Sequence, residues 1–238
     1  MNRRSSGYEL FADRYAAEVD TKPHNAYYER PAMLSLLPRV EGLHVLDAGC
    51  GSGWYTKHLL DQGAKVTAVD VTPRFVELTR QRVGAGARVL QADLAEPLEF
   101  AADREFDLVV CALVLHYLRD WTGALREFRR VLRPSGLLVF STHHPFMDWQ
   151  QFEREDYFAT ELLEDEWGTG TVTFYRRPLT SVVEALSENG FVIERLLEPQ
   201  PLDEYRQANP QWYERLMTSP WFLLIRARRL PDEEDAAG

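Results

Sequence analysis

Short apolar runs alternate with amphipathic segments along the middle of the chain. The runs are rich in valine, leucine and alanine, which is typical of strands that are covered on both faces of a parallel sheet. They predict strands at 44–47, 65–70, 88–92, 106–111 and 137–141. Between them, apolar residues at helical spacing predict helices at 54–61, 73–83 and 121–132, with a loop or degraded helix at 96–103. Strands and helices that alternate in this way predict a doubly wound α/β fold.

The two ends of the chain depart from this alternation. Two helices are predicted before the first strand, at 8–19 and 25–37, although Pro31 favours a start of the second helix at its own position. After the fifth strand, residues 143–175 form an aromatic-rich insertion. The remainder predicts a helix at 179–188, a strand at 191–197, a loop at 199–210, a short helix at 211–217 and a last strand at 221–228.

Composition narrows the class of protein. The chain has 238 residues, 45% of them hydrophobic, and a net charge of −10, which argues against a dedicated nucleic-acid binder but leaves open an enzyme that acts on RNA through a local patch. The two cysteines give no disulfide framework and suit a reducing compartment. Neither a signal peptide nor a membrane-spanning run is evident, so we expect a cytoplasmic protein with no membrane partner.

A glycine turn follows the first predicted strand. Residues 45–53 read V-L-D-A-G-C-G-S-G and combine a strand end, three alternating glycines and the start of a helix, which is typical of a nucleotide-like cofactor site. A dinucleotide fingerprint needs a third glycine where this chain has Trp54. A phosphate-binding loop needs Gly-Lys-Ser/Thr, and a nucleophile elbow around Ser52 needs glycine at Cys50; both are absent.

Three acids follow three successive strands and point to a cationic cofactor. Asp47 stands where a pyrophosphate would be repelled and an ammonium attracted. Asp70 can bind ribose hydroxyls and Asp93 the adenine amino group, while Val71 and Leu94 can pack on the purine. These features fit S-adenosylmethionine, with S-adenosylhomocysteine as the product.

Several of these segments resemble class I S-adenosylmethionine-dependent methyltransferases of the type-11 methyltransferase domain group. The resemblance rests on residues 45–53, 66–70, 91–94, 106–118 and 132–141, with further likeness at 27–32 and 174–191. It implies a Rossmann-like, mostly parallel seven-stranded sheet with the last strand antiparallel and helices on both faces. It also implies that Tyr15 or Tyr28, together with Arg30, closes over the methionine end. The cofactor contacts that it implies in the core are Asp47, Gly49, Asp70, Asp93, Leu94 and Cys111, the last through its backbone. Gly51, Gly53 and Val71 join this set from the glycine turn and the end of the second strand.

Histidines at the ends of two strands are candidate general bases. His143 and His144 follow the fifth strand and His116 follows the fourth, and an imidazole can take a proton from a hydroxyl or amine acceptor near neutral pH. Methyl transfer can also proceed by alignment alone. We expect no metal site, because the H-H-x-x-x-D pattern at 143–148 has no helical context.

The insertion is the candidate acceptor pocket. Its aromatic residues form either a wall for the acceptor, the core of a lid or a dimer contact, and those assigned to the pocket are Trp149, Phe152, Tyr157 and Trp167, with Phe158 beside them. Arg176 and Arg177 either meet an anionic substrate or form ordinary surface ion pairs.

The expected function is methyl transfer to an oxygen or nitrogen of a small molecule by a monomer or homodimer. A tRNA or protein methyltransferase and a non-catalytic cofactor-binding homologue remain alternatives. We expect a single domain over 1–238, with a helical cap at 1–40, a cofactor-binding core at 41–142, a substrate cover at 143–178 and the C-terminal part of the sheet at 179–230.

Overall fold

A mixed sheet organises the molecule in the computed structural model, which describes residues 12–167 and 170–232. Its seven strands lie in the order β3-β2-β1-β4-β5-β9-β8. β9 is antiparallel to both of its neighbours and the other pairs are parallel, so the predicted mostly parallel sheet with an antiparallel last strand is confirmed. The strands are β1 (His44–Ala48), β2 (Lys65–Asp70), β3 (Arg88–Gln91), β4 (Phe106–Ala112), β5 (Leu132–His143), β8 (Phe191–Leu197) and β9 (Phe222–Arg229).

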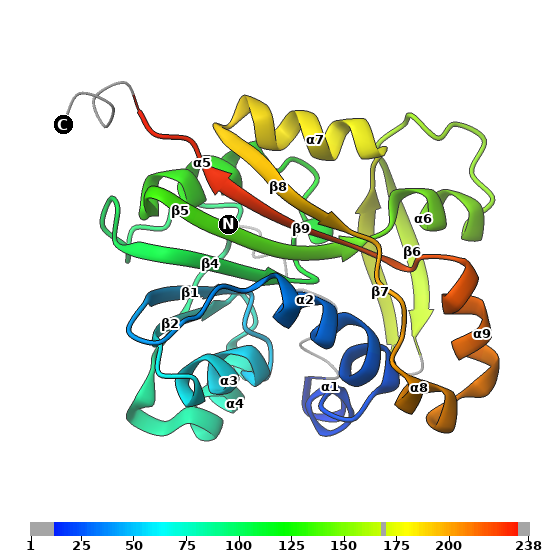
Figure 1. Cartoon of the computed structure of the whole chain (residues 1–238), viewed down its shortest axis with the longest axis horizontal. Helices are drawn as coiled ribbons and strands as arrows, with labels where there is room; N and C mark the ends of the chain where they lie inside the picture. Colours follow the sequence, from blue (N-terminus) through cyan, green and yellow to red (C-terminus); the bar gives the residue numbers. More distant parts are fainter. Residues whose placement is uncertain (1–11, 168–169, 233–238) are drawn as a thin grey trace.

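Helices cover both faces of the sheet because its strands are apolar on both sides (Figure 1). In β4, Leu108 and Val110 pack on one face and Val109 and Cys111 on the other, as the two-residue period of a strand requires. α5 (Thr122–Val131) and α7 (Leu179–Glu188) pack on the face of Val109. α2 (Arg30–Leu36), α3 (Trp54–Asp61) and α9 (Pro210–Thr218) pack on the face of Leu108, and α4 (Pro73–Val83) lies beside β2 and β3.

The N-terminal segment forms two helical stretches, as predicted, but the second is not regular. α1 covers Ala12–Val19, and the first four residues of the predicted helix, 8–11, lie outside the described residues. A π-helical turn, η2 (Asn25–Glu29), leads into α2, whose first turn contains Pro31. A proline is tolerated there because the first helical N–H groups need no partner within the helix.

Other predicted boundaries need correction. The insertion contains a helix, α6 (Pro145–Gln151), and a hairpin of β6 (Glu161–Trp167) and β7 (Gly170–Arg176). The predicted loop 199–210 contains α8 (Asp203–Ala208). β5 begins at Leu132 and not at the predicted residue 137, because Leu132 already pairs with Phe106 before the register shifts. Single turns, η3 (Gly84–Gly86) and η4 (Leu115–Tyr117), follow α4 and β4.

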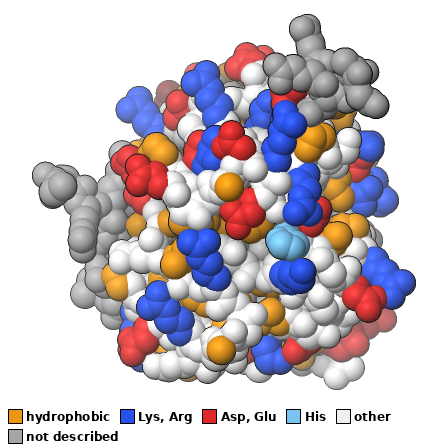
Figure 2. All heavy atoms as spheres, turned by 90° about the vertical axis from the view of Figure 1, so that its left-hand side faces the viewer, with side chains coloured by type: hydrophobic (Ala, Val, Ile, Leu, Met, Phe, Trp, Pro, Cys, Tyr) orange, Lys and Arg blue, Asp and Glu red, His pale blue; other side chains and the backbone are white. Residues whose placement is uncertain are grey.

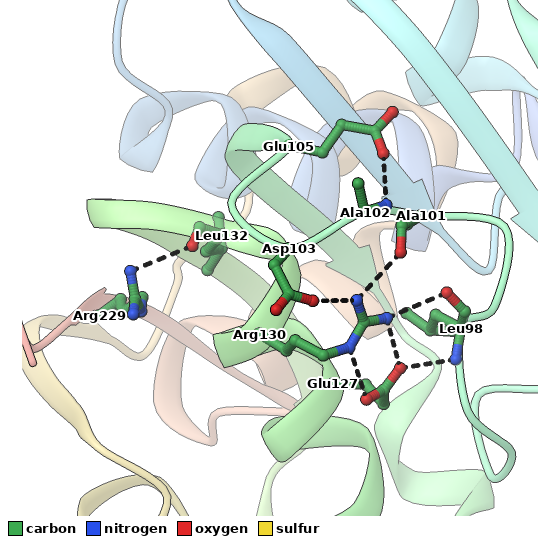
Figure 3. Close-up of polar contacts among 9 residues, drawn as sticks. All are labelled: Leu98, Ala101, Ala102, Asp103, Glu105, Glu127, Arg130, Leu132 and Arg229. Atoms are coloured by element: carbon green, nitrogen blue, oxygen red, sulfur yellow. Dashed lines mark hydrogen bonds and ion pairs between the residues drawn. The ribbon is translucent and has the colours of Figure 1, made fainter.

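The segment between β3 and β4 has neither helix nor strand, and side chains of α5 hold it in place (Figure 3). Arg130 donates to the carbonyl oxygens of Leu98 and Ala101, each at 3.0 Å, and to the carboxylate of Asp103 at 2.7 Å. Glu127 accepts from the backbone N–H of Leu98 at 2.6 Å. These bonds satisfy backbone groups that a helix would otherwise pair, so this segment keeps a fixed path after β3.

Candidate functional site

One large cavity of about 820 Å³ opens at the carboxyl ends of the central strands. Open α/β sheets bind ligands at this edge, and the volume lies in the upper part of the range of about 300–1,000 Å³ for small-molecule sites. Its walls come from the loops after β1 to β4, the N-terminal segment, the insertion, and residues around α9 and β9. In Figure 1, α6, the hairpin, α8 and α9 gather at the right-hand end of the sheet.

The glycine turn after β1 brings bare backbone to one end of this cavity. Gly49, Gly51 and Gly53 have φ angles of 85°, 53° and 83°. A Cβ atom at Gly49 would lie 2.3 Å from Val114 and one at Gly53 would lie 2.8 Å from Thr79, so both positions exclude a side chain. Gly51 faces open space, and Gly49 and Gly51 line the cavity while Gly53 precedes α3.

Asp70 joins the end of β2 to the glycine turn. Its carboxylate accepts hydrogen bonds from the backbone N–H groups of Gly51, at 2.9 Å, and Thr72, at 2.8 Å. Burial raises the pKa of Asp70, while these bonds oppose that shift. Val71, Asp93 and Leu94 line the same end of the cavity, and Asp93 accepts from the N–H of Ala95 at 2.9 Å. The structure therefore brings together the four residues predicted to surround the ribose and adenine.

Asp47 and Cys111 lie behind the cavity wall instead of on it. Neither is among the residues lining the cavity. Asp47 is 1% exposed and accepts a 2.5 Å hydrogen bond from the hydroxyl of Thr56, and burial raises its pKa to about 7. Cys111 lies in the core on the face of the sheet that carries Val109. The next residue, Ala112, lines the cavity. The predicted direct contact of the Asp47 carboxylate with an ammonium is not supported by this geometry.

The N-terminal segment contributes Tyr15 and Arg30, as predicted, but not Tyr28. Arg30 lies 4.3 Å above the Trp54 ring and donates to the carbonyl oxygens of Val19 and Asp20 at 2.9 and 2.8 Å. Tyr15 lines the cavity, and burial raises its pKa to about 12. Tyr28 is buried against Phe222 and accepts a hydrogen bond from the N–H of Trp221 at 2.8 Å, so it belongs to the core.

Glu29 is a lining residue that sequence reasoning missed. It is 1% exposed and accepts hydrogen bonds from the hydroxyls of Tyr55, at 2.8 Å, and Ser141, at 2.6 Å. Burial raises its pKa. The one signal in the sequence is an acid in an apolar, aromatic helix, which also fits a solvent-exposed position.

Two of the three candidate histidines meet in the cavity. The rings of His116 and His143 stack with centroids 4.2 Å apart, and the Nδ1 atom of His143 lies 3.5 Å from the carboxylate of Asp148. Burial lowers the pKa of His116 well below 6.5, so its ring is neutral. His144 is outside the cavity lining: its Nδ1 accepts from the N–H of Phe146 at 3.3 Å, and its Nε2 lies 2.7 Å from Glu198.

The aromatic residues of the insertion divide between wall and lid core. Phe152 lines the cavity, whereas Trp149 and Tyr157 pack together with ring centroids 6.0 Å apart and line no part of it. The Tyr157 hydroxyl accepts from the N–H of Leu179 at 3.1 Å. Phe158 is 75% exposed, and the side chain of Trp167 lies outside the described structure. Trp149 and Tyr157 therefore pack within the insertion and not on the cavity wall.

Arg176, the last residue of β7, and Arg177 are buried instead of lying on the surface, and both have structural partners. Arg176 donates to the carboxylate of Glu161 at 2.9 Å, and Arg177 donates to the carbonyl oxygen of Leu118 at 2.5 Å over the ring of Trp121. Neither lines the cavity. Within the described residues, no cluster of three metal-ligating side chains is found, and no helix is long and apolar enough to cross a bilayer.

Comparison with known proteins agrees with this geometry. Residues 46–140 match the family described as "Methyltransferase domain". The structure of an S-adenosylmethionine-dependent methyltransferase from Mesorhizobium loti superposes with a TM-score of 0.70 at 29% identity, over 89% of this chain and 100% of that one. An uncharacterized protein from Haemophilus influenzae is 27% identical over 87% of this chain and 89% of its own length.

A further relative is malonyl-[acyl-carrier protein] O-methyltransferase from Serratia marcescens, which is 38% identical over 42% of this chain. The match spans 38% of that relative's length. Residues 46–140 therefore resemble a methyltransferase domain, and the chain shares its fold with an S-adenosylmethionine-dependent methyltransferase of known structure.

Proposed function

We propose that this protein transfers a methyl group from S-adenosylmethionine to an oxygen or nitrogen of a small-molecule acceptor, with S-adenosylhomocysteine as the product. The observation that carries the proposal is one continuous cavity. It runs from Asp70 and Asp93, at the ends of β2 and β3, to the stacked rings of His116 and His143. A donor and an acceptor can therefore lie in one enclosure.

The donor end has groups that fit each part of S-adenosylmethionine. Asp70 and Asp93 offer carboxylates for ribose hydroxyls and the adenine amino group, with Val71 and Leu94 as apolar neighbours. The open side of Gly51 allows close approach to the backbone. Tyr15, Glu29 and Arg30 supply polar groups at the methionine end.

Alignment is the main task of the protein. When bound, the cofactor supplies a methyl group on positively charged sulfur and a neutral thioether as leaving group. Holding two reactants in line can contribute about 7–11 kcal/mol to catalysis. The insertion covers the acceptor end with Met147, Phe152 and Phe174, which exclude water from it.

His143 is the general base in this proposal. Asp148 lies beside its Nδ1 atom, which leaves Nε2 to take the proton of the acceptor. His144 does not fit this role, because both of its ring nitrogens have protein partners.

A nucleic-acid acceptor has little support. Figure 2 shows the left-hand end of the molecule in Figure 1, away from α6 and the hairpin, where Lys and Arg side chains are interspersed with Asp and Glu and form no continuous basic surface. With a net charge of −10, the chain as a whole is not matched to a phosphate backbone.

Calorimetric titration with S-adenosylhomocysteine tests the donor end. Asp70→Ala should raise the dissociation constant more than tenfold, because ribose hydrogen bonds are lost and the glycine turn loses its carboxylate partner. The control is Asp61→Ala, which removes an exposed acid paired with Lys57 outside the cavity. An unchanged constant in Asp70→Ala contradicts the assignment. Failure of the wild-type protein to bind the product overturns the proposed function.

A further inference from the structure

The acceptor end of the cavity contains a polar side chain without a partner. His116 is 2% exposed, and within the described part of the chain neither of its ring nitrogens has a hydrogen-bond partner. Buried polar atoms are nearly always paired, because an unpaired group forfeits its bonds with water. The ring lines the cavity but both nitrogens lie beneath its surface, so a ligand there supplies the missing bonds once the ring turns toward it.

The charges around the cavity disfavour an anionic ligand. Among the described lining residues, the carboxylates are Glu29, Asp70, Asp93, Asp148 and Asp165. Apart from imidazoles, the cationic side chains in the same set are Lys22 and Arg30, both on the N-terminal segment. None of the lining residues contributed by η4, β5, α6 and the hairpin is a lysine or arginine. A carboxylate or phosphate at this end would face acids, while Arg177, whose charge reaches His116, lies outside the lining and does not contact a ligand there.

The shape of the lining favours a flat molecule. Phe174 meets the His143 ring edge-on, with centroids 4.4 Å apart and planes at 79°. Phe152 meets Phe174 in the same way at 5.9 Å and 77°. With the His116–His143 stack, these rings form an aromatic corner that offers both faces and edges to a planar ligand.

We infer that the acceptor is a flat ring compound without negative charge, and that its N–H or O–H group hydrogen-bonds with the imidazole of His116 in the aromatic corner. This inference rests on the proposed function and names the substrate class of the same site. His116 thereby selects the acceptor, while His143 with Asp148 receives the proton.

The test uses four probes that share one ring system: quinoline, 4-hydroxyquinoline, 4-aminoquinoline and quinoline-4-carboxylate. Each is titrated calorimetrically into protein saturated with S-adenosylhomocysteine. The hydroxy and amino compounds should bind at least tenfold more tightly than the carboxylate. His116→Phe keeps a flat ring but removes both nitrogens. In this variant the affinity for 4-hydroxyquinoline and 4-aminoquinoline should fall about tenfold, while the affinity for quinoline stays within twofold. The control is His44→Phe, at the opposite end of β1 and outside the cavity, which should match the wild type.

Three results would overturn the inference. They are equal binding of the carboxylate, an equal loss for quinoline in His116→Phe, and no binding of any probe by protein that binds S-adenosylhomocysteine. The last result leaves the proposed cofactor site intact, whereas loss of product binding by the wild type rejects the proposed function itself.

Discussion

The three candidate histidines differ in the hydrogen bonds that their ring nitrogens can still make. His144 is held at both nitrogens, by Phe146 and Glu198, and so fixes the start of α6. His116 is neutral and unpaired within the described residues, and His143 has a carboxylate on one side only. Whether a histidine can act as a base therefore depends on the hydrogen-bond partners of its two ring nitrogens. The residue type alone does not reveal these partners.

Substitution of His143 tests the role of a base at this scale. With any acceptor that the wild type methylates, His143→Gln should lower kcat about 10²- to 10⁴-fold, the usual contribution of a positioned base. Binding of S-adenosylhomocysteine should stay within twofold, because Gln removes no donor contact. His144→Gln is the matched control and should keep kcat within threefold. A His143→Gln enzyme with full turnover would show that alignment suffices.

The residues at the donor end could be predicted where backbone position decides contact. Asp70 ends β2 and Asp93 follows shortly after β3, and such positions reach the sheet edge whatever the side-chain packing. Asp47 and Tyr28 lie away from the cavity lining for a different reason. Whether a side chain faces a cavity or a helix depends on the packing of other elements, here on Thr56 of α3 and Phe222 of β9.

At the scale of elements, a hydrogen bond joins His24, the residue before η2, to Tyr205 of α8 beside the cavity. The Nδ1 atom of His24 lies 2.8 Å from the hydroxyl of Tyr205, and the His24 ring packs edge-on against Trp212 and Trp221. Burial, with Lys22 nearby, lowers the pKa of His24 to about 4. The folded protein therefore binds fewer protons here than the unfolded chain.

Stability should consequently fall as the solution is acidified. The contribution of His24 is complete above the unfolded pKa of about 6.5 and is lost as the pH falls toward 4. Between pH 8 and pH 5 the loss is about 2 kcal/mol from this residue. His24→Asn keeps a polar atom near Tyr205 but does not titrate, so its free energy of unfolding should depend less on pH.

Urea unfolding of the wild type and of His24→Asn at pH 8 and at pH 5 measures how the free energy of unfolding of each protein depends on pH. Comparison of the two proteins cancels the opposite contribution of Asp47, whose raised pKa makes stability fall as the pH rises from about 4 to 7. Parallel pH profiles in the two proteins would contradict the role of His24.

Elements were predictable where one face is apolar and regular, and not where they line the cavity. The central strands and α5 follow from their patterns because both face the core. In β6, Leu163 is buried whereas its neighbour Leu162 is 56% exposed and lines the cavity. Two adjacent leucines with opposite environments give no alternation, so the hairpin was not predicted from the pattern.

At the scale of the whole molecule, the cavity joins segments that are far apart in the chain. Tyr15 and Phe222 line it together with the loops of the central strands. The central loops form the donor end, whereas the insertion and η4 form the acceptor end. A change in the hairpin should therefore affect the acceptor and leave the donor alone.

Phe174 and Leu163 allow this separation to be tested, because they face each other across the hairpin and only Phe174 lines the cavity. Phe174→Leu should raise the KM for the acceptor at least tenfold, since the edge contact with His143 is lost, and leave S-adenosylhomocysteine binding within twofold. Leu163→Ala leaves a void in the core and should lower the free energy of unfolding by about 2–5 kcal/mol, but it should keep the acceptor KM within threefold. If donor and acceptor binding weaken together in Phe174→Leu, the two ends are not independent, because a change at one wall then moves the whole enclosure.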